Sequence, residues 1–89
     1  MKLIQCRECG DVYSLSHQRK CCTCTATSGW YEDDGLHAVA TGPATLIGFH
    51  NTRFREAKLD ASIDPDPARG KRFEAFVICD PCPTFRRLT

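Results

Sequence analysis

Long apolar runs are missing from this sequence of 89 residues, and no segment approaches the roughly 20 apolar residues of a transmembrane helix. The segment Met1–Cys6 carries one lysine and only Leu3 and Ile4 before polar sequence resumes. This is not the pattern of a secretory or lipoprotein signal. We therefore expect a cytoplasmic protein that does not associate with a membrane.

A strong charge of either sign is also missing. Twelve Lys and Arg residues stand against eleven Asp and Glu residues, for a formal net charge of +1. Because general nucleic-acid binders carry a broad basic surface, this balance disfavours that class. Zinc ribbons often bind nucleic acids, however, and Arg86 and Arg87 beside Phe85 are placed to touch a phosphate backbone. Nucleic-acid binding therefore stays an alternative.

Patterns of catalytic residues are scarce. The sequence has no Ser/His/Asp order, no paired carboxylates in apolar surroundings and no glycine-rich phosphate loop before a helix. Cys79-Asp-Pro-Cys82 has the spacing of a redox pair but lacks the βαβ context of such motifs. We expect a protein that is not an enzyme.

Cysteine, in contrast, is abundant, with seven residues in close groups. Cys6-Arg-Glu-Cys9 is followed by Gly10, and Cys21-Cys22-Thr-Cys24 begins eleven residues after that glycine. Two short cysteine turns that face each other supply the four thiolates that zinc binds tetrahedrally at about 2.3 Å. The odd count, the clustering and the lack of an export signal argue against disulfides. The sequence predicts one structural zinc site.

The second pair of ligands is ambiguous at this stage. Cys21 with Cys24 repeats the spacing of Cys6 and Cys9, whereas Cys22 with Cys24 makes a tighter turn. A closed site takes only four ligands, so one of these cysteines is spare. Cys79 and Cys82 are a rival pair, but proximity in sequence favours residues 21–24. The spacing around His17, His37 and His50 offers no second metal site.

The sequence predicts a single α+β, β-rich domain over residues 1–89. Residues 1–25 read as a zinc ribbon, a hairpin with rubredoxin-like knuckles in which Leu3 and Ile4 precede the first cysteine turn and Val12 and Leu15 follow it. Residues 26–89 are expected to form a small sheet of short antiparallel strands with one helix, and the domain to have five or six strands in all. Residues 33–35 are predicted to form a hairpin turn, and the apolar segment 73–78 a central strand.

The single helix is predicted at about residues 52–61. Asn51 or Thr52 is expected to cap its first amides, and prolines end it after Asp64. Its apolar stripe consists of Phe54, Ala57, Leu59 and Ile63.

A phosphate-bearing small ligand is one candidate partner. A helix N-terminus offers free amides and positive potential to phosphate, a basic loop can close over it, and aromatic side chains can stack on a base or fill a partner's pocket. The candidate residues are His50, Asn51, Thr52, Arg53, Arg69, Lys71, Arg72, Trp30 and Tyr31. In the alternative interpretation Asn51 and Thr52 only cap the helix, Trp30 is core, and the arginines face water.

Taken together, these motifs make the chain similar to a group of small phage-encoded proteins of uncharacterised function. The shared features are Cys6, Cys9 and Asp11; Cys22 and Cys24; and the segments 27–34, 42–51 and 73–84. The resemblance favours Cys22 over Cys21 as ligand, because the group's turn is Cys-x-Cys, and it treats Cys79 as a local variation. One departure is Thr25, where the group usually has glycine.

The resemblance implies a phage origin and the cytoplasm of a bacterial host. It brings no established activity. Since catalytic patterns are missing, we expect a non-enzymatic zinc protein that acts by binding, either by sequestering a nucleotide-type signal or by blocking a host defence protein. The alternatives are a nucleic-acid-binding zinc ribbon and a structural or assembly protein. The edge strands of so small a sheet also invite homo-oligomerisation.

Overall fold

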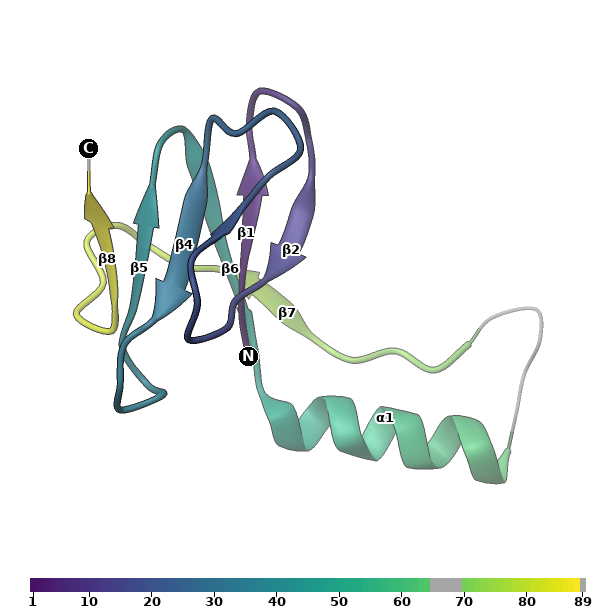
Figure 1. Ribbon diagram of the computed structural model, residues 1–89. Coiled ribbons are helices and arrows are strands. Elements are labelled where there is room, and N and C mark those ends of the chain that lie inside the picture. Colours follow the sequence, from purple (N-terminus) through teal and green to yellow (C-terminus); the bar gives the residue numbers. More distant parts are fainter. Residues whose placement is uncertain (65–69, 89) are drawn as a thin grey trace.

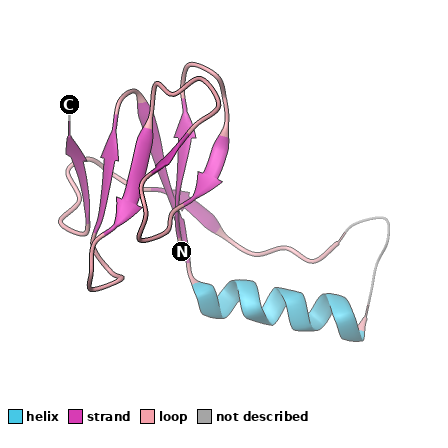
Figure 2. Ribbon diagram, viewed as in Figure 1, coloured by secondary structure: helices cyan, strands magenta, loops and turns pink. Residues whose placement is uncertain are grey.

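The computed structural model describes residues 1–64 and 70–88, and these form eight strands and one helix (Figures 1 and 2). The strands are β1 (Lys2–Cys6), β2 (Val12–Ser14), β3 (Lys20–Cys21), β4 (Ser28–Tyr31), β5 (Ala38–Thr41), β6 (Ala44–Phe49), β7 (Ala75–Val77) and β8 (Phe85–Leu88). The helix α1 spans Asn51–Ile63, which confirms the helix predicted at about 52–61. The prediction of a small, sheet-rich chain with one helix is thus confirmed, although more strands form than the five or six expected.

The strands form two sheets rather than one. The first has the order β2-β1-β6-β7 and is antiparallel throughout. The second has the order β3-β4-β5-β8, in which β8 runs parallel to β5. The chain passes from the second sheet to the first at Gly42 and Pro43, between β5 and β6.

The core lies between the two sheets. Its buried members are Ile4, Leu15, Ala38, Ala40, Ala44, Leu46 and Phe85. Small residues let the sheets approach closely: a Cβ added to Gly29 of β4 would lie 2.4 Å from Cδ1 of Ile4 in the other sheet. Alternation along β6, where Ala44, Leu46 and Gly48 are buried, turns one face of that strand to the core.

The strand β8 was absent from the sequence expectations. Phe85 is only 1% exposed in the core, and Arg86 and Arg87 follow it in a strand that pairs with β5. The pattern is hard to recognise because two arginines interrupt it. A parallel partner 47 residues away in sequence, as in Ala38↔Phe85, also leaves no local turn signal.

The segment 73–78 is not the central strand that we predicted. Its strand β7 is short, lies at the end of the first sheet, and has all three residues exposed. Bulky, β-prone residues are common both in edge strands and in central strands. The composition of this segment therefore does not tell an edge strand from a central one. Glycine at position 48 leaves room for β7, because a Cβ on Gly48 would lie 3.0 Å from the Phe76 ring.

The helix α1 extends away from the sheets (Figure 1). Only Ala57 of its residues is buried, and Phe54 stacks edge-on with Phe49 and packs on Phe73. The predicted stripe is therefore wrong at its second half, since Leu59 and Ile63 are 59% and 72% exposed. The projecting helix raises the radius of gyration to 14.6 Å, against roughly 12 Å for a compact domain of this length.

The start of α1 also differs from the expected capping. His50 occupies the N-cap position with an extended backbone, and no side chain there caps a free amide. The Asn51 side chain instead accepts a hydrogen bond from the N-terminal ammonium group at 2.9 Å. A search of the described residues finds no helix with the length and apolar content needed to cross a bilayer.

Candidate metal centre

Two chain turns at one end of the sheets carry the clustered cysteines. The first turn joins β1 to β2 and contains Cys9, with Cys6 at the end of β1. The second joins β3 to β4 and contains Cys22 and Cys24. Figure 1 shows both turns at the top of the molecule, beside the connection from β5 to β6.

The four sulfur atoms of Cys6, Cys9, Cys22 and Cys24 all lie within 4.8 Å of one another. The Cys24 sulfur is 3.6 Å from that of Cys6 and 3.5 Å from that of Cys22. Four thiolates around one ion at about 2.3 Å are about 3.8 Å apart in a tetrahedron. The four cysteines are thus arranged so that one metal ion fits among them.

The first turn aims main-chain groups at its sulfurs. The Gly10 N–H donates to the carbonyl of Cys6 at 2.8 Å, and the Cys9 N–H lies 3.5 Å from the Cys6 sulfur. Gly10 has φ +78°, a conformation that glycine adopts without the cost that a Cβ brings. The glycine after the Cys-x-x-Cys pair therefore lets the first turn close without strain.

The second turn repeats this arrangement with a different residue at its end. The Thr27 N–H donates to the Cys22 sulfur at 3.4 Å, and the Thr25 N–H to the Cys22 carbonyl at 3.1 Å. Thr25 has φ +65°, and no other described non-glycine residue has a positive φ. Thr25 thus adopts the conformation that a glycine would adopt freely at the same position.

The choice between Cys21 and Cys22 is decided by strand alternation. Cys21 lies in β3 opposite Ser28, and its side chain is exposed. The next residue points to the opposite side, and Cys22 is 3% exposed with its sulfur inside the cluster. Cys22 therefore belongs to the four and Cys21 does not.

Polar contacts that the sequence did not reveal tie the two turns together. One carboxylate oxygen of Asp11 accepts hydrogen bonds from the N–H and the hydroxyl of Thr23, each at 3.1 Å. The hydroxyls of Tyr13 and Thr27 are 3.0 Å apart, and the Arg7 N–H donates to the Pro43 carbonyl at 2.9 Å. An aspartate two residues after the first pair is the only signal of these contacts in the sequence.

The close sulfurs of the cluster shift one another's pKa values in opposite directions. Burial opposes ionisation of Cys22, but the Thr27 side chain and N–H and the nearby sulfurs outweigh it and bring its pKa to about 6. The Ala26 N–H favours the Cys24 thiolate, but the sulfurs of Cys22, Cys9 and Cys6 raise its pKa to about 12. A positive ion among the sulfurs favours ionisation of every thiol, because each thiolate then faces an opposite charge.

The rival pair Cys79 and Cys82 lies outside the cluster of four found among the described residues. Cys79 is exposed, and the Cys82 sulfur lies 3.5 Å from the Thr84 hydroxyl, which lowers the pKa of Cys82.

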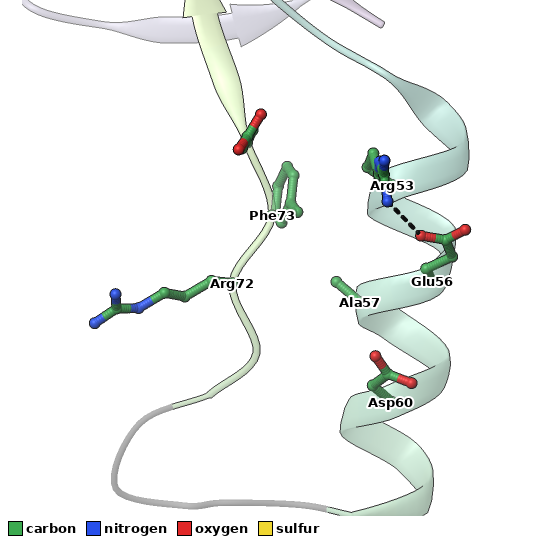
Figure 3. A pocket seen from close by; sticks show the side chains of 7 residues that line it. Arg53, Glu56, Ala57, Asp60, Arg72 and Phe73 are labelled. Atoms are coloured by element: carbon green, nitrogen blue, oxygen red, sulfur yellow. Dashed lines mark hydrogen bonds and ion pairs between the residues drawn. The ribbon is translucent and has the colours of Figure 1, made fainter.

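The residues predicted for a phosphate site are only partly brought together. Arg53 and Arg72 line one cavity of about 330 Å³ (Figure 3). The cavity also contains Glu56, Asp60 and Glu74, and the Arg72 side chain points away from the helix in this view. Three carboxylates beside two guanidinium groups give the cavity an unfavourable charge for a phosphate.

The other predicted ligand residues lie apart from this cavity. Lys71 pairs with Asp64 at 3.6 Å, and the His50 ring lies 5.7 Å from that of Phe76. Thr52 is an exposed residue in the first turn of α1. Arg69 lies outside the described residues.

Trp30 and Tyr31 line a second, open cavity with His17 and three acidic residues, Glu32, Asp33 and Asp34. The Tyr31 hydroxyl accepts a hydrogen bond from the Lys2 N–H at 2.9 Å, and the Lys2 ammonium lies 6.0 Å from the Tyr31 ring. Tyr31 thus helps to join the two sheets.

The arginines considered for nucleic-acid contact have partners within the chain. Arg86 forms an ion pair with Glu32. Arg87 donates to the Ala44 carbonyl at 2.7 Å, and its Nε lies 3.2 Å from Asp80 Oδ2 without the geometry of a hydrogen bond.

Comparison with models of protein families, with curated proteins and with solved structures found no match.

Proposed function

We propose that Cys6, Cys9, Cys22 and Cys24 hold one zinc ion and that the chain is a small zinc-ribbon protein that acts by binding rather than by catalysis. The observation that carries the proposal is the approach of four sulfurs from two separate turns to within 4.8 Å. Zinc is favoured over other metals because four thiolates in a tetrahedron are its usual structural site.

The four-thiolate set also supports a structural role for the ion. A catalytic zinc keeps one position open for water or substrate, whereas four protein ligands close the coordination sphere. The ion would join the β1–β2 and β3–β4 turns, which belong to different sheets. Its contribution is then to hold the sheets together, and the surfaces of the protein are left to bind a partner.

A host protein is the class of macromolecular partner to test first. This part of the proposal depends on the resemblance to small phage-encoded proteins, through Cys6, Cys9, Cys22 and Cys24 and the segments that follow them.

The test is a metal count by native mass spectrometry on the purified protein and on two variants. We expect one zinc per chain in the wild type and in Cys21→Ser, and loss of the ion in Cys22→Ser. Cys21 and Cys22 are neighbours, so this pair separates a ligand from an adjacent thiol of the same chemistry. Retention of one zinc by Cys22→Ser, or a wild type without metal, would contradict the proposed centre.

A phosphate-bearing ligand is the small-molecule alternative, and the three carboxylates that share the cavity of Arg53 and Arg72 weigh against it. Titration calorimetry with pyrophosphate on the wild type and on Arg53→Ala tests it directly. Binding by the wild type that Arg53→Ala abolishes would support this site. The absence of heat at millimolar pyrophosphate would reject it.

A further inference from the structure

The strand β7 leaves a free sheet edge with apolar side chains. It pairs with β6 on one side, through Ile47↔Val77, Gly48↔Phe76 and Phe49↔Ala75, and it ends the described sheet (Figure 1). Phe76 is 47% exposed and Val77 67% exposed. An exposed apolar edge is a template for another strand.

The main-chain groups available on this edge follow from one hydrogen bond. The Ile78 N–H donates to the Leu46 carbonyl at 2.8 Å, so Ile78 and Phe76 direct their polar main-chain groups toward β6. Residues alternate along an antiparallel pair, so Ala75 and Val77 direct theirs outward. A strand that adds here therefore bonds to Ala75 and Val77.

Basic residues lie on both edge strands of the second sheet, β3 and β8, and a lysine of β3 reaches the remaining edge, β2. Lys20 lies in β3 and donates to the Ser14 carbonyl of β2 at 2.9 Å, while Arg86 and Arg87 lie in β8. Charged side chains, lysine above all, protect sheet edges in this way. The strand β7 itself, Ala-Phe-Val, carries no charge.

We propose that β7 pairs antiparallel with β7 of a second copy of this chain, about a twofold axis at Phe76. Under such an axis, residues equally far before and after the centre face each other. Ala75 then faces Val77 of the other copy, and these two residues exchange the outward main-chain hydrogen bonds. Phe76 faces its own equivalent at a position without hydrogen bonds, where cross-strand side chains approach most closely.

Charge complementarity selects the second copy and this register. Arg72 and Asp80 are both exposed and lie four residues before and after Phe76, beyond the two ends of β7. One Asp80 oxygen lies 3.2 Å from Arg87 Nε of the same chain, which leaves the other carboxylate oxygen for an arginine of the second copy. Centring the pair on Phe76 therefore sets Arg72 opposite Asp80 twice. Centring it on Val77 would set Glu74 opposite Asp80, two like charges, and centring it on Ala75 would give Arg72 an apolar partner, Ile78. Opposite charges across a strand pair stabilise it, and like charges destabilise it.

The dimer goes beyond the proposed metal centre and does not use its ligands. The strand β7 is at one edge of the first sheet, whereas β2, which follows the first cysteine turn, is at the other edge. Sedimentation velocity measures the oligomeric state, and a metal count on the same samples measures the zinc content, so the two proposals are tested separately. The zinc count can then fail while the dimer holds, or the reverse.

The experiment follows the mass of the purified chain from low to high micromolar concentration. We expect it to rise from 10.0 kDa toward twice that value. Phe76→Lys, which places two ammonium groups on the axis, should abolish the dimer. Val12→Lys is the matched control, because Val12 is a similarly exposed apolar residue, at 51%, on the edge strand β2. A wild type that stays monomeric, or a dimer that survives Phe76→Lys, would overturn the proposal.

Two further sets of variants keep the test independent of any folding defect in Phe76→Lys. Val77→Pro removes an outward N–H without touching the bonds to β6, and should also abolish the dimer. Arg72→Asp and Asp80→Arg should each raise the dissociation constant by about tenfold or more, since attraction becomes repulsion at two places. The double variant should restore it, because the charges face each other again. A double variant as weak as the single variants would reject the register.

Discussion

The body is the two-sheet core around the cysteines, and the arm is α1 with β7, the strand at the edge of the first sheet. The two regions differ in how many of their residues are buried. In the body, two sheets share a buried core, and two turns bring four sulfurs together. In the arm, one residue of a 13-residue helix is buried, and β7 has all of its residues exposed. The proposed zinc would therefore concentrate stability in the body, while the arm offers surface for contacts.

Chelation of the proposed zinc should separate the two regions most strongly. Structural zinc contributes on the order of 10 kcal/mol in small zinc-finger peptides at neutral pH. Because a domain of this size has a net stability of roughly 5–10 kcal/mol, removing the ion should unfold the body. Hydrogen exchange should then show loss of protection in β1, β4, β5 and β6.

The same experiment should change α1 little, since an exposed helix of this length is only marginally stable even with the metal bound. Amides of the body that stay protected in excess chelator would show that the core alone holds the sheets. The metal would then not be the reason that the body is more stable than the arm.

A pair of leucine truncations sharpens the contrast without touching the metal. Leu46 is 1% exposed in the core and Leu59 is 59% exposed on α1. Leu46→Ala should lower the free energy of unfolding by about 2–5 kcal/mol, because it leaves a cavity. Leu59→Ala should change it by less than about 0.5 kcal/mol. Chemical denaturation measures both, and equal effects would mean that α1 packs as tightly as the sheets.

A pair of glycine substitutions tests how closely the sheet connection packs on the second cysteine turn. Gly42 and Gly10 both have positive φ, but a Cβ on Gly42 would lie 2.0 Å from the Ala26 carbonyl oxygen, whereas Gly10 faces open space. Gly10→Ala should therefore cost about 1 kcal/mol from backbone strain alone. Gly42→Ala should cost roughly 2 kcal/mol more, because main-chain atoms must move. Thermal unfolding of the two proteins gives the difference, and similar melting temperatures would contradict the close packing.

The smallest expected effect is a gain in stability at Thr25. A non-glycine residue in the left-handed region costs about 1–2 kcal/mol, part of which returns as the greater freedom of glycine in the unfolded chain. Thr25→Gly should therefore stabilise the body by about 0.5–1 kcal/mol. Thr23→Gly in the same turn should destabilise it, since Thr23 donates its hydroxyl to Asp11. A loss of stability in Thr25→Gly would show that contacts of the Thr25 side chain stabilise the protein by more than its backbone strain costs.

Much of the cysteine cluster could be predicted, because its signals are local. Cys6, Cys9 and Gly10 lie in one turn, and Cys22 and Cys24 in another, so short spacing located both turns. It left Cys21 and Cys22 as alternatives, and the alternation of side chains after β3 decided for Cys22. The phosphate site was less accessible to such reasoning. Its residues come from α1 and from the segment before β7, and the carboxylates that join Arg53 and Arg72 in one cavity are on both.

The sequence by itself thus determined the cysteine turns, the helix and most of the strands, since each depends on residues within a few positions of one another. Only the tertiary structure decided that the strands divide into two sheets, that Phe85 fills the core and that β7 is an edge. These features depend on pairing between distant segments, and the same β-prone residues are compatible with a central strand or an exposed one. The partner strand decides between them, and no local pattern encodes it.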